Sequence, residues 1–289
     1  MKNLNKRKLL ILAVFVLLFL TGCASNTGPD GNILPEKIIS LTTSFQDILK
    51  GSWFDAFFIW PIAQLINYIS QYINVVWAVG LVTVIVNLLI LPITISSQES
   101  QQRMQLLQPE MDKINRKYEG KNDERSLQLK AKETQDLYKK HDIKMGATML
   151  GLVIQLPIVM AMFYAVQRSS AVIDGVFLGF SLKTTPWAGI TSFQMFYIIL
   201  FILVGIAQFL SIKLPSLLTK KELKNDRRIK DYDKPKQEGP NQDMMSYGML
   251  ALILWISATS PAAMGVYWLF NALVNVAKTL YVQKIKMKK

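Results

Sequence analysis

The chain has 289 residues, of which 51% are hydrophobic, and it carries a formal net charge of +13. A soluble domain of this length would not be so apolar, and a nucleic-acid-binding protein would not carry its charge between long apolar runs. The composition therefore indicates an integral membrane protein whose basic segments flank the membrane and contact anionic lipid headgroups.

The amino terminus has the pattern of a secretory signal. Basic residues at positions 2 and 6–8 precede twelve apolar residues at 9–20, a run too short for a comfortable membrane span. The sequence Leu20-Thr21-Gly22-Cys23 then resembles the cleavage site of bacterial lipoproteins, and Cys23 is the only cysteine. We predict that 1–22 is a signal peptide and that Cys23 is lipidated. The alternative is an uncleaved anchor with an incidental cysteine.

Two segments separate this signal from the first long apolar run. Residues 23–52 are polar and contain glycine and proline, which predicts a flexible, external, lipidated tether. In the next segment, 53–74, amide side chains recur at spacings of three, four and three, on one helix face: Gln64, Asn67, Gln71 and Asn74. Tryptophan and tyrosine rings in the same segment are of the kind that lie at headgroup level. The segment is therefore predicted to be an interfacial amphipathic helix.

Five apolar runs follow and predict transmembrane helices at 75–94, 148–166, 193–212, 244–257 and 262–282. With the lipidated end outside, the carboxyl terminus faces the cytoplasm. The cytoplasmic segments 96–144, 213–243 and 278–289 then hold 25 lysines and arginines, against four in the external segments. This bias agrees with the positive-inside rule for a bacterial plasma-membrane protein. We predict an all-α integral membrane protein with a five-helix core at 75–283 and a basic cytoplasmic tail at 284–289.

The cytoplasmic segment 96–144 predicts a helical hairpin. Apolar residues recur at spacings of three and four: Met104, Leu107, Met111, Ile114 and Tyr118. Residues 119–123 break the pattern, and Asp123 is a candidate N-cap for a second helix. Two interpretations remain for this long connection. It is either a solvated spacer or a hairpin that docks on partners or the membrane surface through Met104, Leu107, Met111 and Ile114.

The cytoplasmic loop 213–243 is rich in lysine, arginine, proline and glycine, and the tail is also basic. Such segments bind polyanions through long-range attraction. Ribosomal RNA and lipid headgroups are equally good partners for both.

Polar residues recur within four of the five predicted spans. The candidate groove residues are Thr83, Asn87, Gln155, Tyr197, Gln208, Trp268 and Asn271. Each one alone is explained by hydrogen bonding between helices. Polar stripes on four spans indicate instead a shared wet cavity, because polarity buried in a membrane usually marks function. The single histidine, His141, lies in the hairpin segment and the sequence contains no metal-ligand motif, so we predict no enzyme activity and no cofactor.

Several short motifs occur in the order and spacing of a known family. The chain resembles the YidC-type membrane insertases of the Oxa superfamily, in the lipoprotein form found in Gram-positive bacteria. The resemblance covers about 53–284 and rests on Leu91-Pro92-Ile93-Thr94, Gln102-Arg103-Met104, Leu107-Gln108-Pro109-Glu110-Met111, Gln155-Leu156-Pro157-Ile158, Gln208, Pro261, Gly265-Val266-Tyr267-Trp268 and Asn271.

The resemblance implies that the substrates are nascent membrane proteins. In this family a hydrophilic groove, open to cytoplasm and lipid, receives the polar tail of a substrate while its apolar segment slides along spans three and five. By motif, Gln208 and Trp268 match groove residues, but Asn87 stands where the family typically has arginine. The hairpin is implied to receive the substrate, and the ribosome and the general secretion channel are candidate partners. The alternatives are an assembly chaperone or scaffold without insertion activity, and a small-solute channel.

Overall fold

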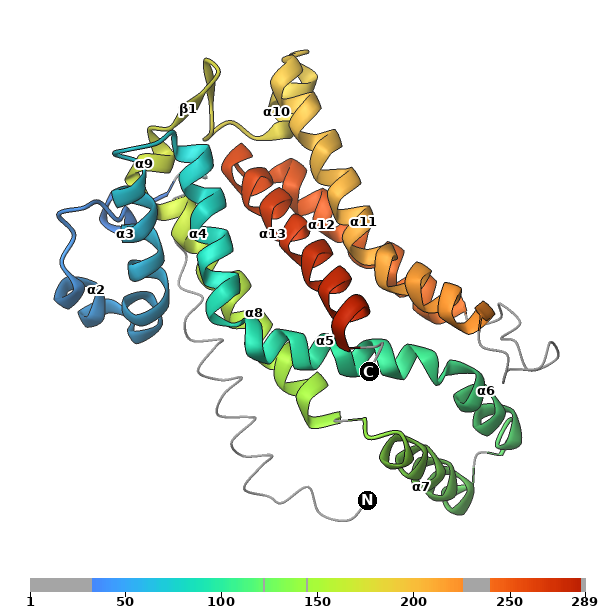
Figure 1. Ribbon diagram of the computed structural model, residues 1–289. Helices are drawn as coiled ribbons and strands as arrows, with labels where there is room; N and C mark the ends of the chain where they lie inside the picture. The colour runs from blue at the N-terminus through green and yellow to red at the C-terminus, as the bar shows by residue number, and fades with distance from the viewer. Residues whose placement is uncertain (1–32, 122, 144, 226–239, 287–289) are drawn as a thin grey trace. The chain divides into compact units, whose positions relative to one another are not determined.

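The computed structural model describes residues 33–286 apart from 122, 144 and 226–239. The predicted signal peptide, Cys23 and the end of the basic tail lie outside the described residues. Helices dominate the described chain (Figure 1), which confirms the prediction of a helical protein. A small antiparallel hairpin of β1 (Val176–Phe177) and β2 (Phe180–Ser181) interrupts them. The chain forms two compact units.

The first unit comprises the chain up to Leu88, Ile154–Gly205 and Leu254–Asn271. A 3-10 turn at Pro35–Lys37 and a π-helical segment at Asp55–Ile59 lie near its start. The helices that lie wholly or partly in this unit are α2 (Phe45–Gly51), α3 (Trp60–Ile69), α4 (Val75–Leu89), α8 (Met145–Arg168), α9 (Ser170–Ile173), α10 (Pro186–Thr191), α11 (Met195–Asn225), α12 (Pro240–Thr259) and α13 (Ala262–Tyr281).

Short polar side chains set the start of several of these helices. Ser44 accepts a hydrogen bond from the Gln46 amide at the start of α2, and Thr185 accepts one from the Ala188 amide at the start of α10. At the start of α4, Asn74 Oδ1 accepts from the Val76 amide at 3.0 Å. These bonds satisfy amide groups that the first turn of a helix leaves without partners.

The segment before α3 is fastened to the end of α8. Ile39 is fully buried and forms a parallel bridge with Ser169, donating its amide to the Arg168 carbonyl at 2.7 Å. Asn67, on α3, donates to the Ile39 carbonyl at 2.7 Å and accepts from the Ser169 hydroxyl at 2.6 Å. One buried amide side chain thus joins three separate stretches of chain. The buried Arg168 guanidinium also pairs with Asp55 and donates to the Lys37 carbonyl.

These contacts correct two predictions. The flexible tether predicted at 23–52 is wrong for its described part, 33–52, which contains the turn, α2 and the buried Ile39. The polar face predicted for the 53–74 helix exists, but Gln64 and Asn67 use it to bind backbone carbonyls of the preceding segment. A polar stripe satisfied by the protein's own backbone has the same spacing as one that faces lipid headgroups, so sequence alone could not separate the two.

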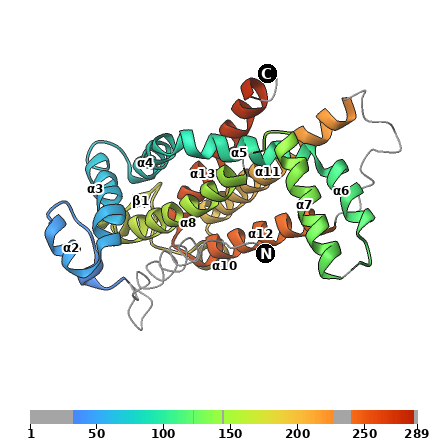
Figure 2. The same cartoon turned by 90° about the horizontal axis from the view of Figure 1, so that it is seen from below.

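The second unit comprises Leu89–Val153, Ile206–Ile253 and Ala272–Lys289. It contains α5 (Leu91–Leu106), α6 (Gln108–Lys117) and α7 (Glu124–Lys140), and α6 lies beside α7 (Figure 2). Asp123 caps α7 by accepting from the Ser126 amide at 2.9 Å, as predicted.

Proline residues break the helices of this part of the chain at positions where the apolar pattern continues. The helix predicted to run to 94 ends at Leu89, and α5 begins with Pro92 in its first turn. The first arm of the hairpin is likewise broken at Leu107, because Pro109 lies in the first turn of α6. Proline has no amide hydrogen to donate and is therefore favoured in the first turn of a helix, although α8 and α11 accommodate Pro157 and Pro215 in their interiors.

Among the described residues, one helix, Met195–Thr219, is long and apolar enough to cross a membrane. The number rises to two if the bent pair Val75–Leu89 and Leu91–Leu106 is counted as a single span. Shorter apolar helices occur at Val153–Arg168 and Tyr247–Thr259. The five-span arrangement therefore stays a prediction.

The Arg168–Asp55 pair predicts a large stability difference between two aspartates. Asp55→Ala leaves a buried guanidinium without its carboxylate, and this should lower the free energy of unfolding by about 3 kcal/mol. Asp47→Ala is the matched control, because Asp47 pairs with Lys50 on the surface, with both side chains more than 60% exposed. Denaturation of the purified protein in detergent measures both. Equal losses in the two variants would contradict the structural role of Asp55.

Candidate functional site

The polar groups that the first unit buries between α4 and α13 form the candidate site. Asn87 on α4 is 5% exposed, and Asn271 on α13 is 6% exposed. The Asn87 amide nitrogen lies 3.3 Å from Asn271 Oδ1 and 2.9 Å from the Thr83 carbonyl. Thr83 is fully buried and donates its hydroxyl to the Val79 carbonyl. Three of the predicted groove residues are therefore brought together in one network.

This network is polar but uncharged. An amide offers both donors and acceptors, whereas an arginine would offer donors and a full positive charge. The cluster can hydrogen-bond a polar group or water, but it exerts no long-range attraction on an anion. The Asn87–Asn271 bond also agrees with the simpler explanation of hydrogen bonding between helices.

Trp268 lies on the same helix as Asn271, three residues earlier, and is 8% exposed. Its ring lies 5.2 Å from that of Tyr267, centroid to centroid, at an interplanar angle of 49°. Tyr267 is itself 1% exposed, so the two rings form a nearly buried aromatic pair at this level of α13.

Tyr197 belongs to a different set of contacts. Its hydroxyl donates to the Ser181 carbonyl of β2 at 2.7 Å, and its ring packs edge-on against Phe180. A Cβ atom on Gly189 would overlap the same ring, so glycine is required where α10 approaches it. At 1% exposure, Tyr197 fastens α11 to the β-hairpin, and its role in a groove stays a prediction.

Gln155 and Gln208, the remaining predicted groove residues, lie on different helices. Gln155 is half-buried on α8 in the first unit. Gln208 is 4% exposed on α11 and belongs to the second unit.

The predicted docking residues of the hairpin form its own core. Leu107, Leu137 and Ile143 are buried, and Met104, Met111 and Ile114 pack against them. These side chains therefore pack within the hairpin, and their docking on partners stays a prediction. The repeat at spacings of three and four is the same for an internal seam and an external one, and only the position of α7 distinguishes them. The exposed apolar side chains on α7 are instead Leu127 and Leu129, at 54% and 43% exposure.

An apolar cavity of about 510 Å³ in the first unit was not predicted. It is lined by side chains from α4, β1–β2, α11 and α13, among them Trp77, Phe196, Ile199, Leu203 and Phe270. Several of these side chains are also exposed on the surface, including Ile199 and Leu203 at 50% and 46%. Sequence patterns missed it because it is assembled from segments far apart in the chain.

A polar row on α5 was also missed. In the second unit, Gln102 is 1% exposed and Ser97 and Ser100 are buried as well, as is Thr279 on α13. The local sequence is polar on all sides, so no stripe distinguished the buried residues from the solvated ones. Among the described residues, no group of three or more histidine, cysteine, aspartate or glutamate side chains could hold a metal ion.

An ion pair between the two arms of the hairpin predicts a pH dependence. Glu133 on α7 accepts from Lys117 Nζ at 2.6 Å and from the Tyr118 hydroxyl at 2.8 Å, both from the end of the first arm. Both hydrogen bonds lower the pKa of Glu133, and the bond from Lys117 has the larger effect. A lowered carboxyl pKa stabilises the folded hairpin above the ordinary carboxyl range near pH 4, and the contribution disappears as pH falls through the lowered value.

Spin labels at Arg116 and Lys132, in a Cys23→Ala background, should therefore move apart as the pH falls below about 4. Glu133→Gln should separate them at neutral pH. Glu124→Gln is the control, because Glu124 only accepts from Gln128 within α7. If Glu133→Gln left the distance between the labels unchanged at neutral pH, this role would be contradicted.

The Asn87–Asn271 bond predicts measurable coupling between α4 and α13. A double-mutant cycle with Asn87→Ala and Asn271→Ala should give an interaction free energy of roughly 0.6 kcal/mol, the average for such bonds between membrane helices. A cycle of Asn87→Ala with Asn67→Ala should give a value near zero, because Asn67 belongs to the separate network around Ile39. Additive effects in the first cycle would show that the two amides do not interact.

Comparison with known proteins supplies the family. The protein-family model described as 60Kd inner membrane protein matches residues 65–289 of this chain. The chain is 30% identical over 284 residues to membrane protein insertase MisCA of Bacillus subtilis, covering 97% of this chain and 92% of that protein. It is 28% identical to membrane protein insertase YidC 1 of Halalkalibacterium halodurans (94% and 88% covered) and to YidC 2 of Bacillus anthracis (98% and 96% covered). The chain therefore belongs to the 60Kd inner membrane protein family of YidC/Oxa-type insertases.

Proposed function

We propose that this protein inserts other proteins into the bacterial plasma membrane and helps them fold. The relatives that support this are named membrane protein insertases and align over nearly their whole length. The observation that carries the proposal within the chain is the buried, uncharged network of Thr83, Asn87 and Asn271 between α4 and α13. Polar groups in such a place supply hydrogen bonds where lipid supplies none.

The polar tail of a substrate is the group that needs such hydrogen bonds. A charge at the middle of a bilayer costs roughly 3 kcal/mol on insertion scales, and a wet polar groove shortens the hydrocarbon that it must cross. In this proposal Asn87 and Asn271 bind the tail through their amides, and Gln155, Gln208 and Trp268 extend the polar surface. The protein catalyses no covalent reaction in this mechanism and needs no cofactor.

The apolar segment of the substrate needs a different surface. The cavity of about 510 Å³ lined by α4, α11 and α13 supports its placement beside these helices, because its lining is apolar and partly exposed. Aromatic and aliphatic side chains there bind any apolar segment without selecting its sequence.

The arrangement in the membrane is part of the same proposal. Five spans, with the lipidated Cys23 outside and the carboxyl terminus in the cytoplasm, place 25 basic residues on the side where the positive-inside rule expects them. The hairpin α5–α7 then faces the cytoplasm with the basic loop 213–243 and the tail, which are suited to ribosomal RNA or anionic headgroups. The general secretion channel stays a candidate partner.

Reconstitution into liposomes tests this function. The purified protein should insert a short single-span substrate, and its yield should depend weakly on acidic residues in the tail, because Asn87 contributes only a dipole. Asn87→Arg should raise the yield for acidic tails and lower it for basic ones. Asn87→Ala should reduce all yields modestly, since Thr83 and Asn271 remain.

Matched substrates with acidic, neutral and basic tails separate the alternatives, with yields normalised to the amount of protein. A scaffold without insertion activity would give no yield above empty liposomes with any tail. A uniform loss in Asn87→Arg would indicate that Asn87 only joins α4 to α13. A strong preference of the unmodified protein for acidic tails would contradict the proposed neutral groove.

A further inference from the structure

A row of glutamines lies along one face of α5. Gln98, Gln102 and Gln105 follow one another at spacings of four and three, which places them on the same side of the helix. At one end of the row, the Gln98 amide donates to the Thr279 hydroxyl. At the other end, the Thr219 hydroxyl donates to Gln105 Oε1 at 3.3 Å. All five residues belong to the second unit.

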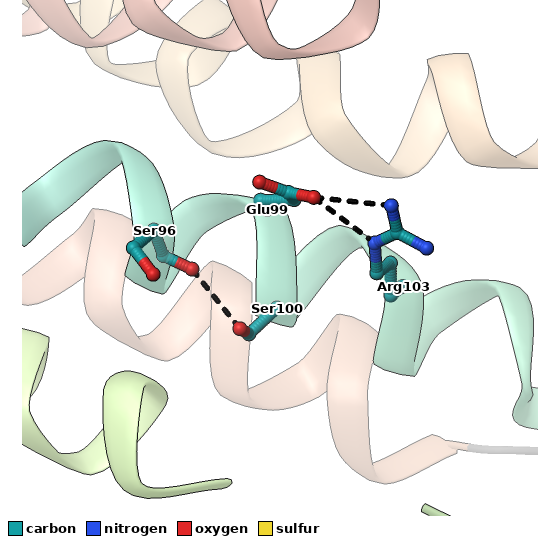
Figure 3. Close-up of polar contacts among 4 residues, drawn as sticks. All are labelled: Ser96, Glu99, Ser100 and Arg103. Carbon is teal, nitrogen blue, oxygen red and sulfur yellow. Dashed lines mark hydrogen bonds and ion pairs between the residues drawn. The ribbon is translucent and has the colours of Figure 1, made fainter. Parts of the chain in front are cut away.

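Gln102, at the centre of this row, is different from its neighbours. Its side chain is 1% exposed, and neither Nε2 nor Oε1 has a hydrogen-bond partner in the described part of the chain. Gln98 and Gln105 are bonded to other helices, and several further polar side chains of α5 are bonded along the helix itself. Figure 3 shows Glu99 accepting twice from Arg103, and the Ser100 hydroxyl donating to the Ser96 carbonyl. Among the described side chains of α5, Gln102 is the one whose buried amide atoms lack a partner.

A buried amide without a partner lowers the stability of a protein. Burial removes its hydrogen bonds to water, and nothing replaces them. Methionine has a similar length and fits a helix without this cost. Each such group in a folded protein requires an explanation, and a ligand that supplies the missing hydrogen bonds is one.

The chemistry of the amide side chain limits the class of ligand that can bind it. A primary amide presents donors and an acceptor side by side, so its complement must present an acceptor and a donor in the same way. A phosphate diester has acceptors but no donor, and an ammonium group has donors but no acceptor. The peptide unit of a polypeptide backbone has both, with one N–H and one C=O.

We propose that Gln102, when the side chains that cover it move aside, binds the backbone of an extended polypeptide, the polar tail of a substrate, by hydrogen bonds to one peptide unit. This inference rests on the proposed function and names the part of the substrate that is recognised. Backbone hydrogen bonds are the same for every sequence, so one glutamine can serve tails of any composition or charge. Gln98 and Gln105, bonded to Thr279 and Thr219, hold the helix on both sides of this contact.

The test uses the purified full-length protein and two synthetic twelve-residue peptides with the same polar side chains. In the second peptide, ester bonds replace alternate amide bonds, which removes N–H groups and leaves the shape nearly unchanged. The unmodified protein should bind the all-amide peptide roughly three- to tenfold more tightly, the range expected for one or two neutral hydrogen bonds. Gln102→Met should bind both peptides equally, with an unchanged or higher melting temperature.

Gln105→Met is the matched control. It removes a bond within the protein and should lower the melting temperature while the preference for the all-amide peptide persists. Gln102→Leu provides a second apolar variant in case the methionine variant folds poorly. A preference that survives in Gln102→Met or Gln102→Leu, or that is absent from the unmodified protein, would overturn the proposal and leave a bound water as the partner of Gln102.

The same preparations are scored for insertion in liposomes. Peptide preference that depends on Gln102, without any insertion, would support the backbone site and refute the insertase function. Insertion without any peptide preference would refute only the backbone site.

Discussion

Hydrogen bonding by amide side chains in apolar surroundings is the interaction on which much of this structure depends. Lipid and packed hydrocarbon offer no partners, so each buried polar group must find one within the chain or on a ligand. Asn67 finds its partners in the backbone at Ile39 and in the Ser169 hydroxyl. Asn87 finds Asn271 and the Thr83 carbonyl. Gln102 finds none among the described residues, which is why it is the candidate for an external ligand.

The choice of amides over charged groups has a functional consequence. A guanidinium buried among these helices would attract carboxylates over several ångströms, but it would also require a counter-charge or water. The chain provides a counter-charge for the buried guanidinium of Arg168, whose partner is Asp55. The Thr83 carbonyl and the Asn271 amide that contact Asn87 are neutral, so the recognition proposed there uses short-range hydrogen bonds. A binding surface of this kind accepts substrates of differing charge, as the proposed function requires.

The two compact units divide the proposed tasks between them. The first unit contains the Asn87–Asn271 network and the apolar cavity beside α11 and α13. The second contains the hairpin, whose seam is closed internally by Leu107, Leu137 and Ile143, and the glutamine row of α5. The seam is occupied in this structure, and the exposed apolar side chains on α7 are Leu127 and Leu129.

The sequence by itself determined the class of the protein, its helices and its family. Long apolar runs, a strong bias in basic residues and short ordered motifs are local or cumulative signals, and they do not depend on how the chain packs. The Asp123 cap was predictable for the same reason, because a helix start is set within four residues. The breaks before α5 and α6 were readable from Pro92 and Pro109, although the apolar pattern continued across them.

Only the tertiary structure decided which polar and apolar helix faces are covered by other parts of the same protein. Spacing shows that Gln64 and Asn67 share a face, but not that backbone carbonyls cover it. The same holds for Tyr197, a predicted groove residue whose hydroxyl bonds Ser181, and for the methionine-rich seam of the hairpin. A helix face has one periodicity whether its partner is lipid, water, substrate or another helix, so the partner becomes known only when distant segments are brought together.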